Sequence, residues 1–222
     1  MGQQFGLAVQ LNSLTNRWQS LIDELSVTGV KLLAVSKYAP DDAVETLIQA
    51  GEINFGEARP QNLRDRATRW PDCNWHMIGP LQKNKAKYVG RFASMWHSCE
   101  NIETAQAVAR HLSGRVLPVL IQVNIADNPD QHGIRPDELT AFAADLAKID
   151  GLELAGLMGM APKAGDVRSA FVSLRGLRDE LFNGSFGELC MGMSNDYQIA
   201  IEEGATIVRL GSTLFDTGTI KG

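Results

Sequence analysis

The stretch KLLAVSKYAPDDAVETLIQAGEINFGE, residues 31–57, contains one complete strand–helix–strand unit. Residues 31–37 form a short apolar, β-rich run. Residues 41–51 open with two aspartates and close on Gly51, which is typical of a helix with an acidic first turn and a terminal glycine. Residues 52–57 form a second β-rich run. A strand, a helix and a strand in this order predict two parallel neighbouring strands.

The same alternation continues along the rest of the chain. Most of the β-rich runs are followed by a stretch with helical apolar spacing, and they are continuously apolar, as in strands that are covered on both faces. Strand–helix units repeated through a chain of about 200–250 residues favour an α/β fold of the (β/α)8 TIM-barrel class. An open doubly wound sheet is the main alternative, but no G-x-G-x-x-G or phosphate-loop pattern follows the first run. The runs lie at residues 31–37, 52–57, 74–79, 94–99, 116–124, 152–158, 188–194 and 206–211.

The two ends of the chain complete this single domain. Residues 5–26 have the spacing of an amphipathic helix. The segment STLFDTGTIKG, residues 212–222, is too short for a full closing helix, so we expect the N-terminal helix to cover that part of the barrel. The predicted domain spans residues 1–222, with the N-terminal helix within 1–30 and the barrel over 31–215. The apolar face of the N-terminal helix consists of Leu7, Leu11, Leu14, Trp18, Leu21 and Leu25.

The composition limits the class of protein. The chain has 222 residues, of which 44% are hydrophobic, so it can bury a sizeable core. Its formal charge of −5 disfavours a nucleic-acid binder, and no apolar run reaches the roughly 20 residues of a membrane span. The N-terminus lacks the pattern of a signal peptide, and the widely spaced Cys73, Cys99 and Cys190 disfavour disulfides and zinc. We expect a cytoplasmic, monomeric protein that binds no metal, nucleic acid or membrane.

Lys37 ends the first β-rich run. In TIM barrels the chemistry lies at the carboxyl ends of the strands, which is where Lys37 is expected. Burial there would favour the uncharged amine, and an uncharged amine is a nucleophile toward carbonyl groups. The alternative is a lysine whose stem packs on the barrel while its charged end extends into solvent.

The ends of the last two runs form a second candidate site. Phosphate groups commonly bind at the loops after strands seven and eight of such barrels. Glycine lets an anion approach the backbone closely, and a serine can donate its hydroxyl. The alternative interpretation is an ordinary helix cap and a tight turn. The small residues that follow the two runs are Gly192, Ser194, Asn195, Gly211, Ser212 and Thr213.

Arg209 is the charged residue of the eighth run. By strand alternation it shares a face with Gly211, so we expect its side chain to point into the barrel. A buried guanidinium needs a partner, which could be a carboxylate or a ligand ring. Because arginine stays protonated, it would keep a pyridine nitrogen opposite it unprotonated.

Several motifs together resemble one known family. In chain order they are LLAVSK, NFGE, WHMIGPLQKNK, VLIQVN, GLMGM, GMSND and VRLGSTLF. With this order and spacing the sequence resembles the pyridoxal phosphate homeostasis proteins (the YggS/PROSC family) over about residues 31–215. That family is a single barrel similar to the N-terminal domain of alanine racemase. The resemblance therefore implies the same fold as the strand pattern.

The resemblance also implies a cofactor and its site. It implies pyridoxal 5′-phosphate (PLP) held as an aldimine, a Schiff base, with Lys37. Here the lysine motif reads SKYAP, so Tyr38 and Ala39 stand where many members have a threonine and a second lysine, and Ala58 replaces the asparagine of FGEN. Because this chain lacks that second lysine, the resemblance implies no role for it here. The other implied positions are Ser194, Gly211 and Ser212 at the phosphate, Arg209 at the pyridine nitrogen, and Asn54 and Met193 as pocket walls.

The function that the family implies is intracellular PLP (vitamin B6) homeostasis without a catalysed reaction, with PLP-dependent apoenzymes as recipients. Racemase chemistry needs a second acid or base across the cofactor. Alanine racemases supply it as a tyrosine from an additional β domain, and we expect no such domain here, since the sequence ends soon after the eighth run. The alternatives are a minimal PLP-dependent amino-acid racemase and a cofactor-free aldolase that uses Lys37. A regulatory module is a further alternative, with the basic segment 83–87 as its candidate surface.

Overall fold

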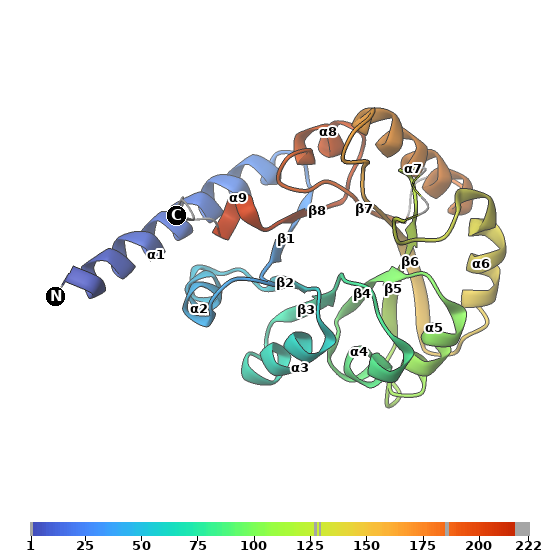
Figure 1. Ribbon diagram of the computed structural model, residues 1–222, viewed down its shortest axis with the longest axis horizontal. Coiled ribbons are helices and arrows are strands. Elements are labelled where there is room, and N and C mark those ends of the chain that lie inside the picture. Colours follow the sequence, from blue (N-terminus) through green and yellow to red (C-terminus); the bar gives the residue numbers. More distant parts are fainter. Residues whose placement is uncertain (1, 127, 129, 185–186, 216–222) are drawn as a thin grey trace.

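The computed structural model describes residues 2–126, 128, 130–184 and 187–215, with side chains described from residue 11 onward. Its strands form one closed parallel barrel in chain order, and the last strand pairs with the first, for example Lys31 with Ile207 (Figure 1). The predicted barrel is confirmed, and closure excludes the open doubly wound sheet. The strands are β1 (Lys31–Val35), β2 (Asn54–Glu57), β3 (Asn74–Met77), β4 (Met95–Cys99), β5 (Leu117–Val123), β6 (Leu152–Gly159), β7 (Glu188–Cys190) and β8 (Ile207–Leu210).

The helices lie outside the strands and follow them around the barrel (Figure 1). The helix after β1 ends where the sequence predicts, because Gly51 adopts a left-handed φ of 110° and its N–H bonds back to the helix. The helices are α1 (Gly2–Ser26), α2 (Asp41–Ala50), α3 (Pro60–Arg69), α4 (Ala86–Phe92), α5 (Ile102–Ala109), α6 (Leu139–Leu146), α7 (Val167–Leu181), α8 (Tyr197–Glu202) and α9 (Ser212–Phe215), with 3-10 turns η1 (Lys83–Lys85) and η2 (Pro136–Glu138).

Helix α1 covers the barrel beside α2 and α9 (Figure 1). The side chains of Leu14, Trp18, Leu21 and Leu25 are buried, as the amphipathic spacing predicts. Trp18 also donates its indole N–H to Oε2 of the buried Glu52 at 2.9 Å, which fixes α1 against the loop before β2. The expected covering role of the N-terminal helix is confirmed, because α1 contacts β1 as well as α2 and α9.

The barrel has two cores. Large apolar side chains such as Phe55, Trp75 and Trp96 fill the layer between the strands and the helices. The inside of the barrel is filled by a separate apolar cluster that includes Leu33 and Met158. Polar side chains are buried in the inside as well, and they supply part of the site described below.

A first prediction concerns the close approach of β6 and β7 at Gly156. A Cβ added to Gly156 would lie 2.1 Å from the carbonyl oxygen of Glu188. We expect Gly156→Ala to lower the free energy of unfolding by about 2–3 kcal/mol, because two backbones must move apart. Urea denaturation measures this change. Gly176→Ala in α7 is the control, since nothing lies within 4 Å of its added Cβ, and an unchanged Gly156→Ala variant would contradict the register of these strands.

Candidate functional site

Lys37 lies just beyond β1, at the carboxyl end of the barrel. Its side chain is exposed, and its Nζ lies 5.1 Å from the ring centroid of Tyr38, which is itself 83% exposed. Of the two alternatives for Lys37, the structure therefore shows the lysine whose charged end extends into solvent, in a turn where the N–H of Ala39 bonds to the carbonyl oxygen of Ser36 at 2.9 Å. The amine extends into solvent, where a small carbonyl compound can reach it.

The turn that carries Lys37 is anchored by a buried polar cluster. Ser36 donates its hydroxyl to Oε1 of Glu57 at 2.6 Å, and Nε of Arg66 lies 3.3 Å from the same oxygen. Arg66 also donates to the carbonyl oxygen of Ala39 at 2.7 Å, just after Lys37. Burial raises the pKa of the Glu57 carboxyl, although the Ser36 hydrogen bond and the Arg66 charge oppose this effect. The sequence analysis missed this cluster, for which a glutamate inside an apolar strand run is the available signal.

The loops after β7 and β8 meet, as the phosphate-site hypothesis requires. The hydroxyl of Ser194 accepts a hydrogen bond from the backbone N–H of Thr213 at 3.1 Å. No partner among the described residues accepts from the backbone N–H groups of Ser194, Gly211 and Ser212. Two chain segments that are distant in sequence thus present unpaired donors at the same end of the barrel, which is an arrangement suited to an anion.

This pair of loops adjoins the strand that leads to Lys37. A Cβ added to Gly211 would lie 3.5 Å from Cβ of Val35, the last residue of β1. Gly192 has a φ of 93°, and a Cβ there would lie 2.7 Å from Cβ of Ala200, so only glycine lets the loop after β7 pack this closely on α8. The predicted phosphate loops and the predicted lysine therefore lie on adjacent parts of the barrel rim.

Met193 and Asn195 lie in the loop after β7, and both are exposed. The backbone N–H of Met193 donates to Oδ1 of Asp196 at 2.6 Å, which holds the loop in a turn before α8. Met193 is close in sequence to Ser194, and its side chain is available to a ligand at the rim.

Arg209 points into the barrel, as strand alternation predicts. Its side chain is buried, with 5% of the residue exposed, and Nη2 donates to the carbonyl oxygen of Gly159 at 3.0 Å. Nε is also buried and has no hydrogen-bond partner within the described part of the chain. An unpaired buried donor costs about 1–3 kcal/mol, so this nitrogen favours a ligand atom that accepts a hydrogen bond.

The structure does not bring Asn54 to Lys37. Asn54 begins β2, and its Oδ1 accepts from Nδ2 of Asn74 at 3.1 Å. The register of β1 and β2 places it opposite Leu33, four residues before Lys37, which is about 13 Å along a strand. Its role as a pocket wall has no support in this geometry.

A chain of polar side chains that the sequence analysis missed crosses the barrel interior. His76 Nδ1 lies 2.8 Å from His97 Nε2, and His97 Nδ1 lies 3.2 Å from Cys190 Sγ. Burial lowers the pKa of His76 to about 4 and holds the pKa of His97 well below its usual value. Burial also raises the pKa of the Cys190 thiol to about 11. All these groups are therefore uncharged at neutral pH.

The described ranges contain neither a candidate membrane-spanning helix nor a group of metal ligands. No helix there combines the length and the apolar composition that crossing a membrane requires. Nor do the described His, Cys, Asp and Glu side chains gather in a group of three or more that could hold a metal ion. The lysine, the paired loops and Arg209 are thus the candidate site.

A closed barrel with a lysine after its first strand and two joined loops after its last strands defines a class of domain. Residues 9–217 match the family described as "Alanine racemase, N-terminal domain". The sequence is 39% identical to the pyridoxal phosphate homeostasis protein of Deinococcus radiodurans, over 84% of this chain and 88% of that protein. It is 34% identical to the protein of the same name from Escherichia coli K12, over 92% and 97% of the two chains.

A solved structure agrees with these relatives. PipY of Synechococcus elongatus, whose structure was solved with PLP bound, has a TM-score of 0.81 and 32% identity, covering 91% of this chain and 99% of PipY. The chain belongs to the family of pyridoxal phosphate homeostasis proteins.

Proposed function

We propose that this protein binds PLP through a Schiff base to Lys37 and acts in intracellular vitamin B6 homeostasis, without a catalysed reaction of its own. One observation carries the proposal. The Lys37 amine is exposed on the barrel rim, and the strand beside it is β8. The loop after β8 presents backbone N–H groups that have no partner among the described residues. PLP has both matching groups, an aldehyde that condenses with an amine and a phosphate that accepts hydrogen bonds.

The residues of the site fit the parts of the cofactor. The unpaired N–H groups of Ser194, Gly211 and Ser212 suit a phosphate, and the glycine lets it approach the backbone. The buried, unpaired Nε of Arg209 suits a ring nitrogen with a free lone pair. Since arginine does not give up its proton, Arg209 would leave that nitrogen unprotonated. Bound PLP supplies an electron sink, and an unprotonated ring weakens that sink.

The tyrosines of the chain support a binding protein over a racemase. Racemisation needs an acid or base on the side of the cofactor opposite the lysine. The Tyr197 hydroxyl donates to Glu24 at 3.2 Å, and the Tyr88 ring lies under Arg64. Tyr38 comes from the same turn as Lys37, so it approaches from the side of the lysine. This placement favours storage and delivery of the cofactor.

Borohydride reduction followed by peptide mass spectrometry tests the proposal. We expect a yellow protein whose colour borohydride bleaches, with the cofactor mass on the peptide that contains Lys37. A colourless protein that borohydride traps only with an added sugar would instead support the aldolase. Conversion of L-alanine to D-alanine by the coloured protein would overturn the non-catalytic assignment.

The proposal includes partners and oligomeric state. PLP-dependent apoenzymes are the proposed recipients, because a protein that holds the cofactor without consuming it must release it to proteins that use it. The protein is proposed to act as a monomer. Sedimentation velocity and the recovery of activity by an added apo-aminotransferase measure these two properties.

A second prediction concerns Arg209 and cofactor affinity. Arg209→Ala removes a charged donor from the proposed ring-nitrogen contact, so we expect PLP affinity to fall by about 1.5–3 kcal/mol, or roughly 10- to 150-fold. Spectroscopic titration with PLP measures this loss. Arg209→Met retains most of the side-chain volume, so it distinguishes the effect of losing the charged donor from the effect of a cavity. Wild-type affinity in both variants would contradict the proposed contact.

A further inference from the structure

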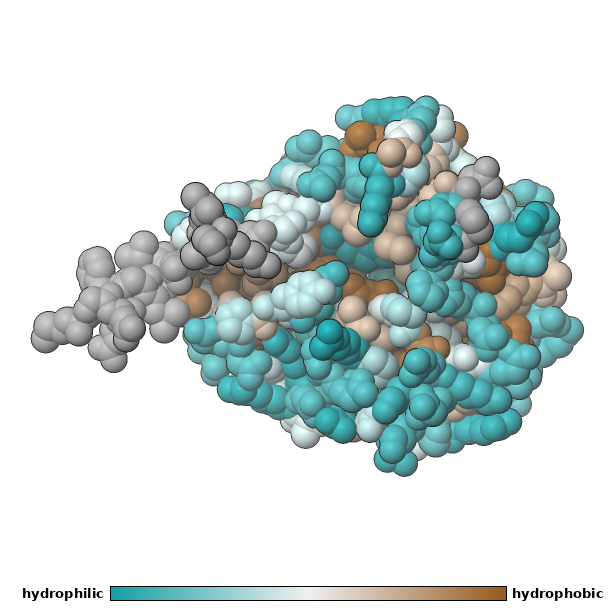
Figure 2. Space-filling view, viewed as in Figure 1, coloured by the Kyte–Doolittle hydropathy of each residue, from teal (hydrophilic) through white to brown (hydrophobic). Residues whose placement is uncertain are grey.

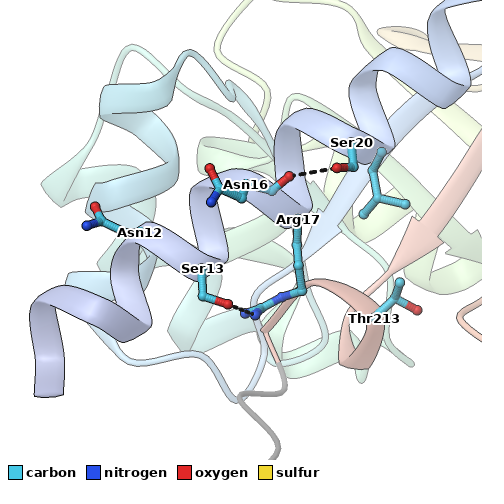
Figure 3. Close-up of a pocket in the computed structure, with 7 residues that line it drawn as sticks. Asn12, Ser13, Asn16, Arg17, Ser20 and Thr213 are labelled. Carbon is cyan, nitrogen blue, oxygen red and sulfur yellow. Dashed lines mark hydrogen bonds between the residues drawn. The ribbon is translucent and has the colours of Figure 1, made fainter.

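Arg17 of α1 bonds directly to α9, near the other end of the chain. Figure 3 shows Arg17 on α1 with its hydrogen bond to Ser13. Its Nε donates to the carbonyl oxygen of Leu214 at 3.0 Å, across 197 residues of sequence. Its Nη1 donates to the hydroxyl of Ser13 at 2.7 Å, one turn earlier in α1. The guanidinium thus connects a long helix to a single turn of helix.

Helix α9 needs such a connection. It spans only Ser212–Phe215, and one helical turn has little stability of its own. The described side-chain hydrogen bonds to it come from two sides, from Arg17 to Leu214 and from Thr213 to Ser194. The first fixes α9 to α1, and the second fixes it to the loop after β7. The proposed phosphate donors at Gly211 and Ser212 directly precede these two restrained residues.

Arg17 is half-buried. A surface groove of about 660 Å³ opens beside it. Its Nη2 is buried, with no hydrogen-bond partner in the described ranges, and such a donor costs about 1–3 kcal/mol. The groove is lined by Asn12, Ser13, Asn16, Arg17, Ser20, Leu21 and Thr213.

We propose that Arg17 is a positioning residue for the phosphate subsite. By holding the Leu214 carbonyl it sets the position of α9, and with it the direction of the backbone N–H groups of Gly211 and Ser212. Arg17 does not contact the ligand in this proposal. The inference rests on the proposed function and adds that selectivity for phosphorylated over unphosphorylated B6 vitamers depends on α1.

The effect of Arg17 is specific for the phosphate end of the ligand. Lys37 follows β1 and Arg209 lies within β8, and neither is bonded to Arg17. Loss of the Arg17–Leu214 bond therefore leaves the aldehyde and ring contacts in place, while the phosphate donors become less ordered. An ordered set of donors binds more tightly because less freedom is lost on binding.

Titration of the Arg17→Met variant with PLP and with pyridoxal tests the inference. We expect the Kd for PLP to rise about tenfold, because the donors must be ordered during binding. The Kd for pyridoxal, which has no phosphate, is expected to stay within a factor of about two of wild type. Arg17→Lys keeps a donor that can reach the Leu214 carbonyl and should restore part of the loss. Ser20→Ala lines the same groove without bonding to Arg17 and is the matched control.

The outcomes separate this inference from the proposed function. Equal weakening of PLP and pyridoxal, or no weakening of either, overturns the positioning role. If wild-type protein binds neither vitamer, the proposed function itself fails. Circular dichroism establishes that each variant is folded. Should Arg17→Met not fold, Arg17→Ala, which also lacks a donor for the Leu214 carbonyl, takes its place. A wild-type ratio of the Kd values for PLP and pyridoxal in that variant counts against the inference.

Discussion

Lys37→Ala should abolish the covalent attachment of PLP while leaving the barrel folded. Lys37 is the residue to which the proposed Schiff base is assigned, and alanine cannot form an imine. The lysine side chain is exposed, so its loss removes little packing, and the free energy of unfolding should change by no more than about 0.5 kcal/mol. The visible imine absorption after PLP loading and borohydride trapping measures the first effect, and urea denaturation measures the second.

Lys83→Ala is the matched control for this variant. Lys83 is also an exposed lysine, and it lies in η1 after β3. We expect it to retain wild-type colour and the trapped cofactor. Imine absorption that persists in Lys37→Ala would place the Schiff base on another lysine and refute the assignment.

Acid should destabilise the fold through the buried histidines. The pKa of His76 is lowered from 6.5 to about 4, because burial and the nearby charge of Lys31 disfavour the imidazolium, with Glu188 opposing. Between these two pH values the unfolded chain binds a proton that the folded chain does not bind, so stability falls as pH falls from about 6.5 to 4. The difference between the two pKa values of His76 corresponds to about 3 kcal/mol of folding stability. His97 faces His76, Cys190 and Arg209, and its lowered pKa adds to this loss of stability.

Urea denaturation of wild type and His76→Gln from pH 7 to pH 4 measures this effect. The variant should lose about 3 kcal/mol less than wild type over this range, because glutamine does not titrate. Burial raises the pKa of Glu52 and Glu57, so these two groups act in the opposite direction, but they are present in both proteins. His111→Gln, which alters a histidine outside the barrel interior, should follow wild type. Parallel curves for His76→Gln and wild type would exclude an uncharged buried His76.

The fold was predictable because its signals are local. Apolar runs such as 31–37 and 206–211, separated by helical stretches, predict parallel strands. The number of strand–helix units then favours a sheet that closes into a barrel. The end of α2 at Gly51 followed from one residue type. The exposure of Lys37 was one of two alternatives, and the sequence did not decide between them, because Glu57 and Arg66 from other elements hold the turn.

The site was predictable only in part, for the same reason. The barrel rule brought the loops of Ser194 and Thr213 together, and the structure joins them by a hydrogen bond. Strand alternation shows which face of the sheet Asn54 lies on, but not its position along the barrel axis. Asn54 and Lys37 lie at different positions along that axis. The contact of Arg17 with α9 depends on the path of the whole chain and has no local signal beyond a charged residue between buried positions of α1.

The pairing of β1 with β8 has a consequence for biosynthesis. A ribosome delivers Arg17 long before Leu214, and β1 has no β8 to pair with until residue 210 has been made. A nascent chain can therefore present the lysine before the loop after β8 exists. If the proposed function holds, the chain gains its full set of phosphate donors only after Ser212 has been synthesised.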